Sequence, residues 1–133
     1  MNIKHLMIDD WVLFKAQKPK KTQIVAIDYT SDIAKHRNSD VWYTSDCFEP
    51  IPIFPNLLLI NGFIKIPDGY IWSSDPNFLD ELYIHVKFRH NGEIRIIEVC
   101  IPNFYHGFFR TINYVHEFQN MTRCLGIFKE FIV

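Results

Sequence analysis

The sequence is poor in glycine and has no excess of charge of either sign. It contains 5 glycines in 133 residues and no GxxxxGK[ST] pattern, which argues against a phosphate-binding loop, because such loops need glycines for close backbone approach. Basic residues number 14 and acidic residues 15, giving a formal net charge of -1. No global field therefore attracts nucleic acid or an anionic membrane, although local patches are not excluded.

Cysteines are also few, and long apolar runs are missing. Cys47, Cys100 and Cys124 are odd in number, widely spaced and outside any CxxC arrangement, which excludes a disulfide framework and a zinc ribbon. We expect buried free thiols. The run around Leu57–Ile60 is far too short to cross a bilayer, and the residues after Met1 do not resemble a signal segment. The sequence thus predicts a soluble cytoplasmic protein without membrane association.

What the chain does have is apolar and aromatic content. Hydrophobic residues make up 48% and aromatic residues 16%, a composition typical of a folded globular protein. The first half contains three short strand patterns, at 10–15, 22–29 and 41–44, with a polar loop at 31–40. Their order and the long loop predict a small SH3-like β-barrel over residues 1–54.

The second half predicts an α+β subdomain over residues 55–133. Pro55 begins a short helix that ends before Gly62, and strands follow at 63–66, 70–73, 82–89 and 93–100. The dipeptide Asn91-Gly92 predicts a type I′ hairpin turn, which would place His90 opposite Glu93. A further strand at 107–112 and a helix at 114–125 complete a mostly antiparallel sheet covered by two helices. The sequence leaves open whether the tail 127–133 packs within the chain.

The C-terminal helix carries the stretch HEFQN, one residue short of the zinc motif HExxH. An apolar stripe on this helix is formed by Tyr114, Phe118, Met121 and Leu125, and the opposite face carries His116, Gln119, Asn120 and Arg123. Asn120 occupies the position of the second histidine, and an amide oxygen is a poor zinc ligand. Three interpretations remain: a solvated face, a polar docking surface, or a metal or hydrolase site using His116 and Glu117. We expect Phe118 to be buried and the polar side chains to face outward.

Two other groups of residues could carry function. Lysines cluster in the first predicted hairpin near aromatic residues, a combination that can bind single-stranded nucleic acid, although the aromatics are equally explained as core. These residues are Lys15, Lys18, Lys20, Lys21, Trp11, Trp42 and Tyr43. The predicted register also places His85 opposite Glu98, which is either a general base with its carboxylate or an ordinary cross-strand pair.

Four short segments resemble a group of small uncharacterised proteins from Bacteroides-type gut bacteria. Their pattern runs IGNWV, EPIPL, NGF and YVHELQNLYFAL, and the matching segments here are 8–12, 48–53, 61–63 and 114–121. Asp9 and Asp10 stand in place of Gly-Asn, Phe54 in place of the usual cap residue, and Arg123 and Cys124 in place of apolar or small residues. The resemblance implies a bacterial cytoplasmic protein and brings no known activity or cofactor.

No complete catalytic constellation is recognisable, so we expect no catalytic residue, no metal and no cofactor. The leading hypothesis is a non-catalytic binding or adaptor module with a protein partner. Weak single-stranded nucleic-acid binding through the N-terminal barrel is the alternative, and a small hydrolase or metal enzyme using His116 and Glu117 is less favoured. The candidate binding residues are His116, Gln119, Asn120, Arg123, Trp11, Lys18, Lys20 and Lys21.

Overall fold

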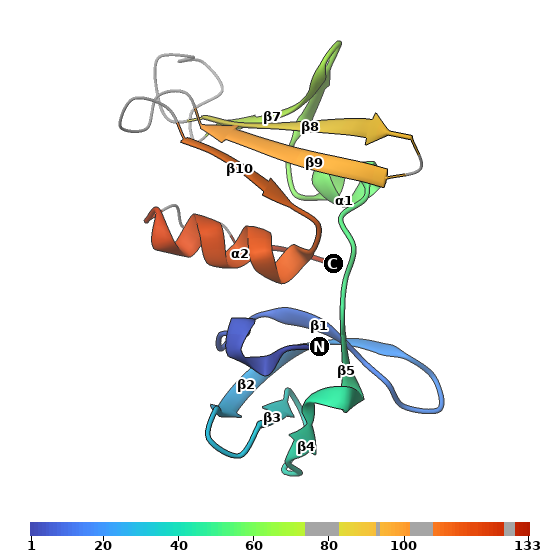
Figure 1. Cartoon of the computed structure of the whole chain (residues 1–133), viewed down its shortest axis with the longest axis vertical. Helices are drawn as coiled ribbons and strands as arrows, with labels where there is room; N and C mark the ends of the chain where they lie inside the picture. Colours follow the sequence, from blue (N-terminus) through green and yellow to red (C-terminus); the bar gives the residue numbers. More distant parts are fainter. Residues whose placement is uncertain (74–82, 93, 102–107, 127–129) are drawn as a thin grey trace. The chain divides into compact units, whose positions relative to one another are not determined.

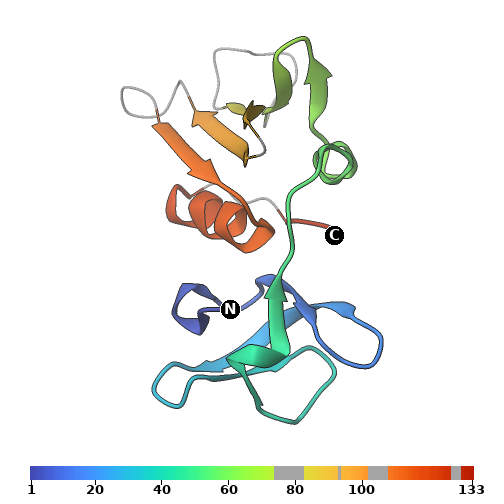
Figure 2. The same cartoon turned by 45° about the vertical axis from the view of Figure 1, so that its right-hand side comes forward.

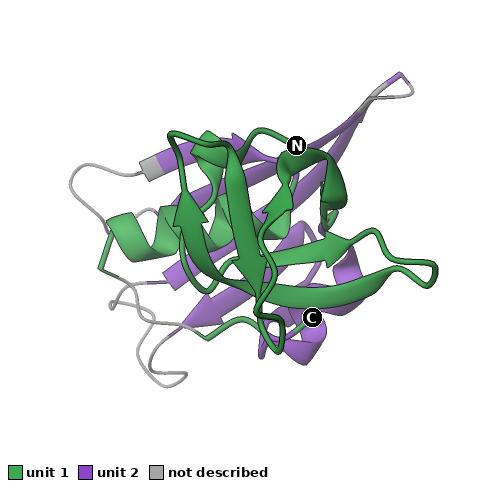
Figure 3. Cartoon of the chain, turned by 90° about the horizontal axis from the view of Figure 1, so that it is seen from below, with its two compact units in different colours: residues 1–52, 114–131, 133 green, residues 53–113, 132 purple. Residues whose placement is uncertain are grey.

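The computed structural model describes residues 1–73, 83–92, 94–101, 108–126 and 130–133. The described residues form mainly β-structure, arranged in two antiparallel sheets of five strands each, with two α-helices (Figure 1). The chain divides into two compact units, one of residues 1–52, 114–131 and 133 and the other of residues 53–113 and 132 (Figure 3). The predicted α+β class is therefore wrong, because strands rather than helices build both units.

The first unit contains β1 (Trp11–Phe14), β2 (Lys20–Asp28), β3 (Ile33–His36), β4 (Tyr43–Thr44), β5 (Phe48–Pro50) and α2 (Val115–Cys124). The strand order is β4-β3-β2-β1-β5 (Figure 2). Its buried cluster comprises Ile3, Leu6, Val12, Ile24, Ala34 and Phe48. Strands β1, β2, β3 and β5 contribute one residue each to this core, and Ile3 and Leu6 come from the segment that precedes β1.

The SH3-like barrel is a wrong prediction, because the first sheet stays open. β4 and β5 are its two edges, although only the 3-10 turn Ser45–Cys47 separates them along the chain. The sheet must bend strongly to bring its edges so close, yet no ladder pairs β4 with β5 among the described residues. β4 has only two residues, and Pro50 in β5 has no N–H to donate, so both edges are poor partners for closure.

The second unit contains α1 (Pro55–Ile60), β6 (Ile64–Ile66), β7 (Gly69–Ser73), β8 (Tyr83–Asn91), β9 (Ile94–Ile101) and β10 (Phe108–Ile112). The strand order is β10-β9-β8-β7-β6, and every neighbouring pair is antiparallel. Pro55 occupies the first turn of α1, and Gly62 follows the helix with a φ of 82°, as the sequence predicts. Leu58 is the helix residue that is fully buried.

The β8–β9 hairpin forms, but its register differs from the predicted one. Asn91 pairs with Ile94 and His90 with Arg95, so the turn lies one residue later than Asn91-Gly92. Gly92 has a φ of 65°, whereas Asn91 is not in the positive-φ region that a type I′ turn would require of it. Each partner therefore moves by two residues, which leaves every side chain on its predicted face.

Helix α2 belongs to the first unit, not to the second sheet as the sequence predicted. Phe118 is fully buried, which confirms that expectation, and its ring centroid lies 5.0 Å from that of Phe131 in the tail. Phe131 is itself buried, and its carbonyl oxygen accepts a hydrogen bond from the Trp11 indole at 2.7 Å. The end of the tail therefore packs within the chain. The predicted subdomains 1–54 and 55–133 differ from these units in placing the helix after the boundary.

Candidate functional site

The polar face of α2 is not a solvated surface. His116 and Gln119 are each only 5% exposed, and Asn120 and Arg123 are half-buried, so the expectation that these side chains face outward is wrong. Gln119, Asn120 and Arg123 point toward the segment that enters β1. These three polar side chains can be buried there because each one finds a partner in that segment.

The partners are backbone atoms and one carboxylate. Gln119 accepts a hydrogen bond from the Trp11 backbone N–H at 2.9 Å and donates to the Asp9 carbonyl at 3.2 Å. Asn120 donates to the His5 carbonyl at 2.9 Å and to the Asp10 carboxylate at 3.2 Å. Arg123 Nη1 lies 2.6 Å from Asp10 Oδ1. These hydrogen bonds and the ion pair therefore hold α2 against the segment that leads into β1.

The Asp10 carboxylate receives the contacts from both Asn120 and Arg123, and it is completely buried. Its other oxygen accepts the Met7 backbone N–H at 2.8 Å. Burial raises the pKa of the Asp10 carboxyl above its usual value, while the Met7 amide, the Arg123 guanidinium and the Asn120 amide oppose that rise. Asp9 has a φ of 70°, so the backbone turns sharply just before this carboxylate.

His116 and Glu117 lie in the first turn of α2. Glu117 Oε2 accepts the Tyr114 backbone N–H at 3.1 Å, which occupies the carboxylate in capping the helix. The His116 ring stacks on Tyr114 at 5.9 Å, its Nδ1 is buried without a hydrogen-bond partner, and burial lowers its pKa. Within the described residues, no group of three His, Cys, Asp or Glu side chains is placed to hold a metal ion.

The aromatic residues of the predicted nucleic-acid site lie mostly in structural contacts. Trp11 is fixed by its hydrogen bond to the tail, and Tyr43 packs among Phe14, His36 and Phe48. Trp42 is 41% exposed, but Lys35 sits 5.0 Å from its ring. Lys18, Lys20 and Lys21 are exposed and Lys15 pairs with Glu49 at 3.0 Å. Among the described residues, the aromatic side chains of this predicted site are therefore engaged in internal contacts to a greater extent than its lysines.

The predicted His85–Glu98 pair does not form, because of the two-residue shift in the hairpin. Glu98 lies opposite Lys87 and pairs with Arg89 at 2.8 Å. His85 Nε2 instead lies 3.5 Å from the Asp68 carboxylate, which is also 3.5 Å from Lys87 Nζ. The three side chains form a loose ion-pair cluster on one face of the second sheet.

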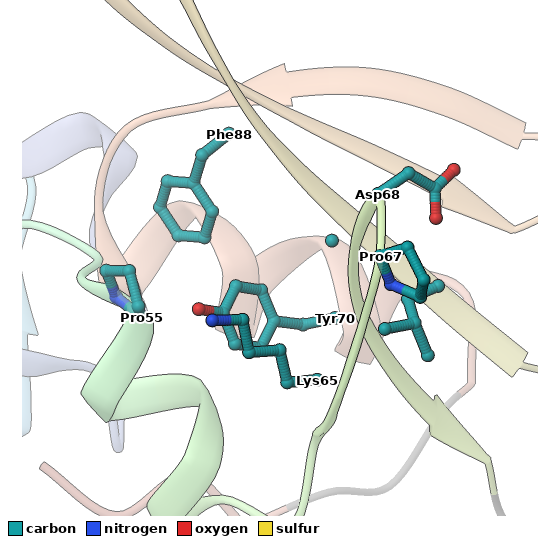
Figure 4. Close-up of a pocket in the computed structure, with 8 residues that line it drawn as sticks. Pro55, Lys65, Pro67, Asp68, Tyr70 and Phe88 are labelled. Carbon is teal, nitrogen blue, oxygen red and sulfur yellow. The ribbon is translucent and has the colours of Figure 1, made fainter.

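One hollow among the described residues lies on the second unit, where the β6–β7 turn meets α1. Its volume is about 290 Å³, and its walls are formed by Pro55, Lys65, Ile66, Pro67, Asp68, Gly69, Tyr70 and Phe88. Lys65 pairs with Tyr70 across β6 and β7, and both side chains extend toward Pro55 (Figure 4). The Phe88 ring meets the Tyr70 ring edge-on at 5.8 Å. We name this site the β6–β7 hollow.

Two cations flank the β6–β7 hollow. Lys65 lines it and is exposed, and the Arg95 guanidinium carbon lies 5.7 Å from the Phe88 ring and 4.9 Å from the Phe54 ring. None of the ion pairs found among the described residues involves Lys65 or Arg95. The Asp68 carboxylate points away from the rings in Figure 4 and is shared by His85 and Lys87. The hollow therefore combines apolar walls with positive charges that have no ion-pair partner among the described residues.

Sequence reasoning did not single out the β6–β7 hollow. The predicted strands at 63–66 and 70–73 imply a turn at residues 67–69, but the position of this turn beside Pro55 depends on how α1 packs. A proline in the first turn of a short helix followed by a second proline in a tight turn is the only local signal. It indicates two rigid corners and not a binding site.

The remaining observations concern the cysteines, the length of the helices and the comparisons with known proteins. The three cysteines are free as predicted, but Cys47 and Cys100 are half-buried and Cys124 is exposed, so the expectation of buried thiols is wrong. Neither described helix has the length and apolar character needed to traverse a bilayer. Comparisons with protein-family models, with curated proteins and with solved structures find no match for this chain.

Proposed function

We propose that the protein is a non-catalytic binding module and that it binds its partner, a peptide segment of another protein, through the β6–β7 hollow. The observation that supports the proposal is the combination of exposed proline and half-buried aromatic walls in one open depression. Grooves lined by aromatic residues and proline accept extended peptides, since the chain inserts single side chains between rigid walls. The volume is slightly below the range of pockets that hold whole cofactors or drug-sized ligands, which favours one or two side chains.

The α2 face is a weaker candidate for the same role. Each of its polar groups that bonds to the β1 entry segment would have to leave a buried partner before it could meet a ligand. Leaving a buried group unpaired costs about 1 to 3 kcal/mol, so a ligand there starts with that penalty. The β6–β7 hollow carries no such penalty, because it is already open.

A selection of peptides from a random phage-displayed library against the full chain tests the proposal. Enriched peptides should bind the wild type and should shift the backbone amide resonances of Lys65, Gly69 and Tyr70 in titrations followed by nuclear magnetic resonance. Phe88→Ala removes one wall of the hollow and should weaken binding at least about fivefold, if the ring contributes about 1 kcal/mol. Phe109→Ala, which removes an exposed ring elsewhere on the same sheet, is the matched control and should leave binding unchanged.

Two results would overturn the proposal. One is a library that yields no binder, and the other is a set of binders that perturb amides away from the hollow and tolerate Phe88→Ala. The shift mapping uses the wild type, so it remains decisive if Phe88→Ala does not fold. Turnover of a substrate in a hydrolase panel that is abolished by His85→Ala or His116→Ala would instead refute the non-catalytic part.

A further inference from the structure

We infer that the ligand of the β6–β7 hollow is an acidic peptide, in which carboxylates flank an aromatic or proline residue. This inference rests on the proposed function and names the chemistry of the partner. It follows from two cations, Lys65 and Arg95, that have no ion-pair partner among the described residues. Lys65 lines the depression, and the Arg95 guanidinium contacts Phe88, which forms one of its walls.

Arg95 is held in a way that suits recognition of a carboxylate. Its guanidinium carbon lies 4.9 Å from the Phe54 ring centroid and 5.7 Å from the Phe88 ring centroid, so the group contacts two aromatic rings. The N–H groups of a guanidinium point outward in its plane, and they match the two oxygens of a carboxylate. The two rings restrict the side chain before a ligand arrives, which reduces the entropy lost on binding.

Lys65 supplies the second positive charge. It is exposed and lies directly across the strand pair from Tyr70, whose largely buried ring forms the floor of the hollow with Phe88. The lysine amine is thus fixed near an apolar floor while its own charge has no carboxylate partner among the described residues. A peptide that places an apolar side chain on this floor brings neighbouring carboxylates toward both cations.

The other charged groups nearby do not cancel this preference. Asp68 lines the turn, but its carboxylate is 3.5 Å from both His85 and Lys87 and faces away from the rings in Figure 4. Those three side chains carry no net negative charge at neutral pH, whichever way the histidine is protonated. The electrostatic complement of the hollow is therefore an anion.

Three acetylated and amidated tetrapeptides test the inference in titrations followed by the Tyr70 amide resonance. The first is glutamate-phenylalanine-glutamate-proline, the second has glutamine in place of glutamate, and the third has lysine. We expect the acidic peptide to bind about two- to twenty-fivefold more tightly than the neutral one and the basic peptide to bind least, since each of the two cations contributes a factor of about 1.4 to about five. Raising the salt concentration from about 0.01 M to about 1 M should remove most of the difference.

A variant that reverses the charge of Lys65 tests the same inference. Lys65→Glu should weaken the acidic peptide at least about fivefold and leave the neutral peptide within about twofold. Lys18→Glu makes the same change in net charge at an exposed lysine of the first unit and should alter neither peptide. Both lysines are on the surface, so neither substitution should prevent folding.

The outcomes separate this inference from the proposed function. Equal binding of acidic and neutral peptides, or tighter binding of a nucleotide such as AMP at the same amides, overturns the inference and leaves a site in the hollow. If no tetrapeptide binds, the peptides selected from the random library decide, because enrichment of aspartate and glutamate supports the inference and its absence overturns it. Failure of both the tetrapeptides and the library refutes the inference and the proposed function together.

Discussion

Replacing Arg123 by methionine should destabilise the first unit strongly, because it leaves a buried carboxylate without its counter-ion. Asp10 is fully buried, and Arg123 Nη1 lies 2.6 Å from it while the arginine side chain is 30% exposed. Removing one partner of a fully buried ion pair costs about 3 to 5 kcal/mol. Water screens the exposed part of Arg123, so we expect a loss of about 2 to 3 kcal/mol at neutral pH.

The stability lost in the Arg123→Met variant should depend on pH in a defined direction. Burial raises the pKa of Asp10 above 3.8 despite the Arg123 guanidinium, so the folded state binds this proton more tightly than the unfolded state. The contribution of this carboxyl to stability is therefore fully present below pH 3.8 and is lost as the pH rises through the folded-state pKa. Without Arg123 the pKa rises further, which makes the variant lose more stability than the wild type on going from acid to neutral pH.

Urea unfolding followed by tryptophan fluorescence, at about pH 3 and about pH 7, measures this difference. The cost of Arg123→Met should fall to about 1 kcal/mol or less at the acidic value, because a protonated Asp10 needs no counter-charge. Asp10→Asn is the matched background, and in it the arginine substitution should cost little at either pH. An equal cost at both pH values, or an undiminished cost beside Asn at position 10, would refute this reasoning.

Three further predictions concern single positions. Gln119→Ala should cost about 1 to 3 kcal/mol in urea unfolding, because it leaves the buried backbone N–H of Trp11 unpaired; an effect below about 0.5 kcal/mol, as at an ordinary surface site, would contradict this. His116→Gln should flatten the loss of stability as the pH falls below 6.5, since burial lowers the pKa of the imidazole and its stabilising contribution is present above 6.5 and lost through the folded-state pKa; an unchanged pH profile would count against it. Gly69→Ala should cost more than Gly92→Ala in thermal unfolding, because a Cβ at position 69 would lie 2.3 Å from a carbonyl oxygen of β8 whereas position 92 is open and both backbones have positive φ; equal costs would show that the strand relaxes.

The sequence predicts most local elements of this fold, but it does not predict β3 (Ile33–His36), which lies in the segment 31–40 that was expected to be a loop. The strand patterns at 10–15 and 22–29 correspond to Trp11–Phe14 and Lys20–Asp28, and the two predicted helices match α1 and α2 to within one residue at each end. These features depend on periodicity, proline and glycine, which act over a few residues. The assignment of faces in the β8–β9 hairpin also survives, because a two-residue shift preserves the alternation.

Features that depend on contacts between distant segments were predicted poorly. The first sheet contains the strands expected of a barrel, but closure needs a ladder between β4 and β5, and the short length of β4 has no clear signature in the sequence. The predicted His85–Glu98 pair does not form because the turn lies one residue later than the Asn91-Gly92 dipeptide indicates. This shift moves each cross-strand partner by two residues. Neither outcome follows from propensity alone.

The prediction that the polar face of α2 is turned to solvent was wrong for a related reason, and this error bears on function. An amphipathic pattern shows only that one side of a helix is polar, and it does not distinguish water from a buried partner. Here the partner of Gln119 and Arg123 lies more than a hundred residues earlier in the chain, in the segment around Asp10. Gln119, Asn120 and Arg123 therefore have hydrogen-bond or ion-pair partners within the first unit.

Satisfaction of hydrogen bonds and charges then becomes a criterion for choosing among candidate sites. The α2 face is rich in polar groups whose partners are already present, so binding there would exchange one set of bonds for another at little net gain. Lys65 and Arg95 have charges without carboxylate partners among the described residues, beside rings that a ligand can cover. A ligand that supplies anions and an apolar side chain gains both interactions without breaking an internal one, which is why the β6–β7 hollow, and not HEFQN, is the site to test first.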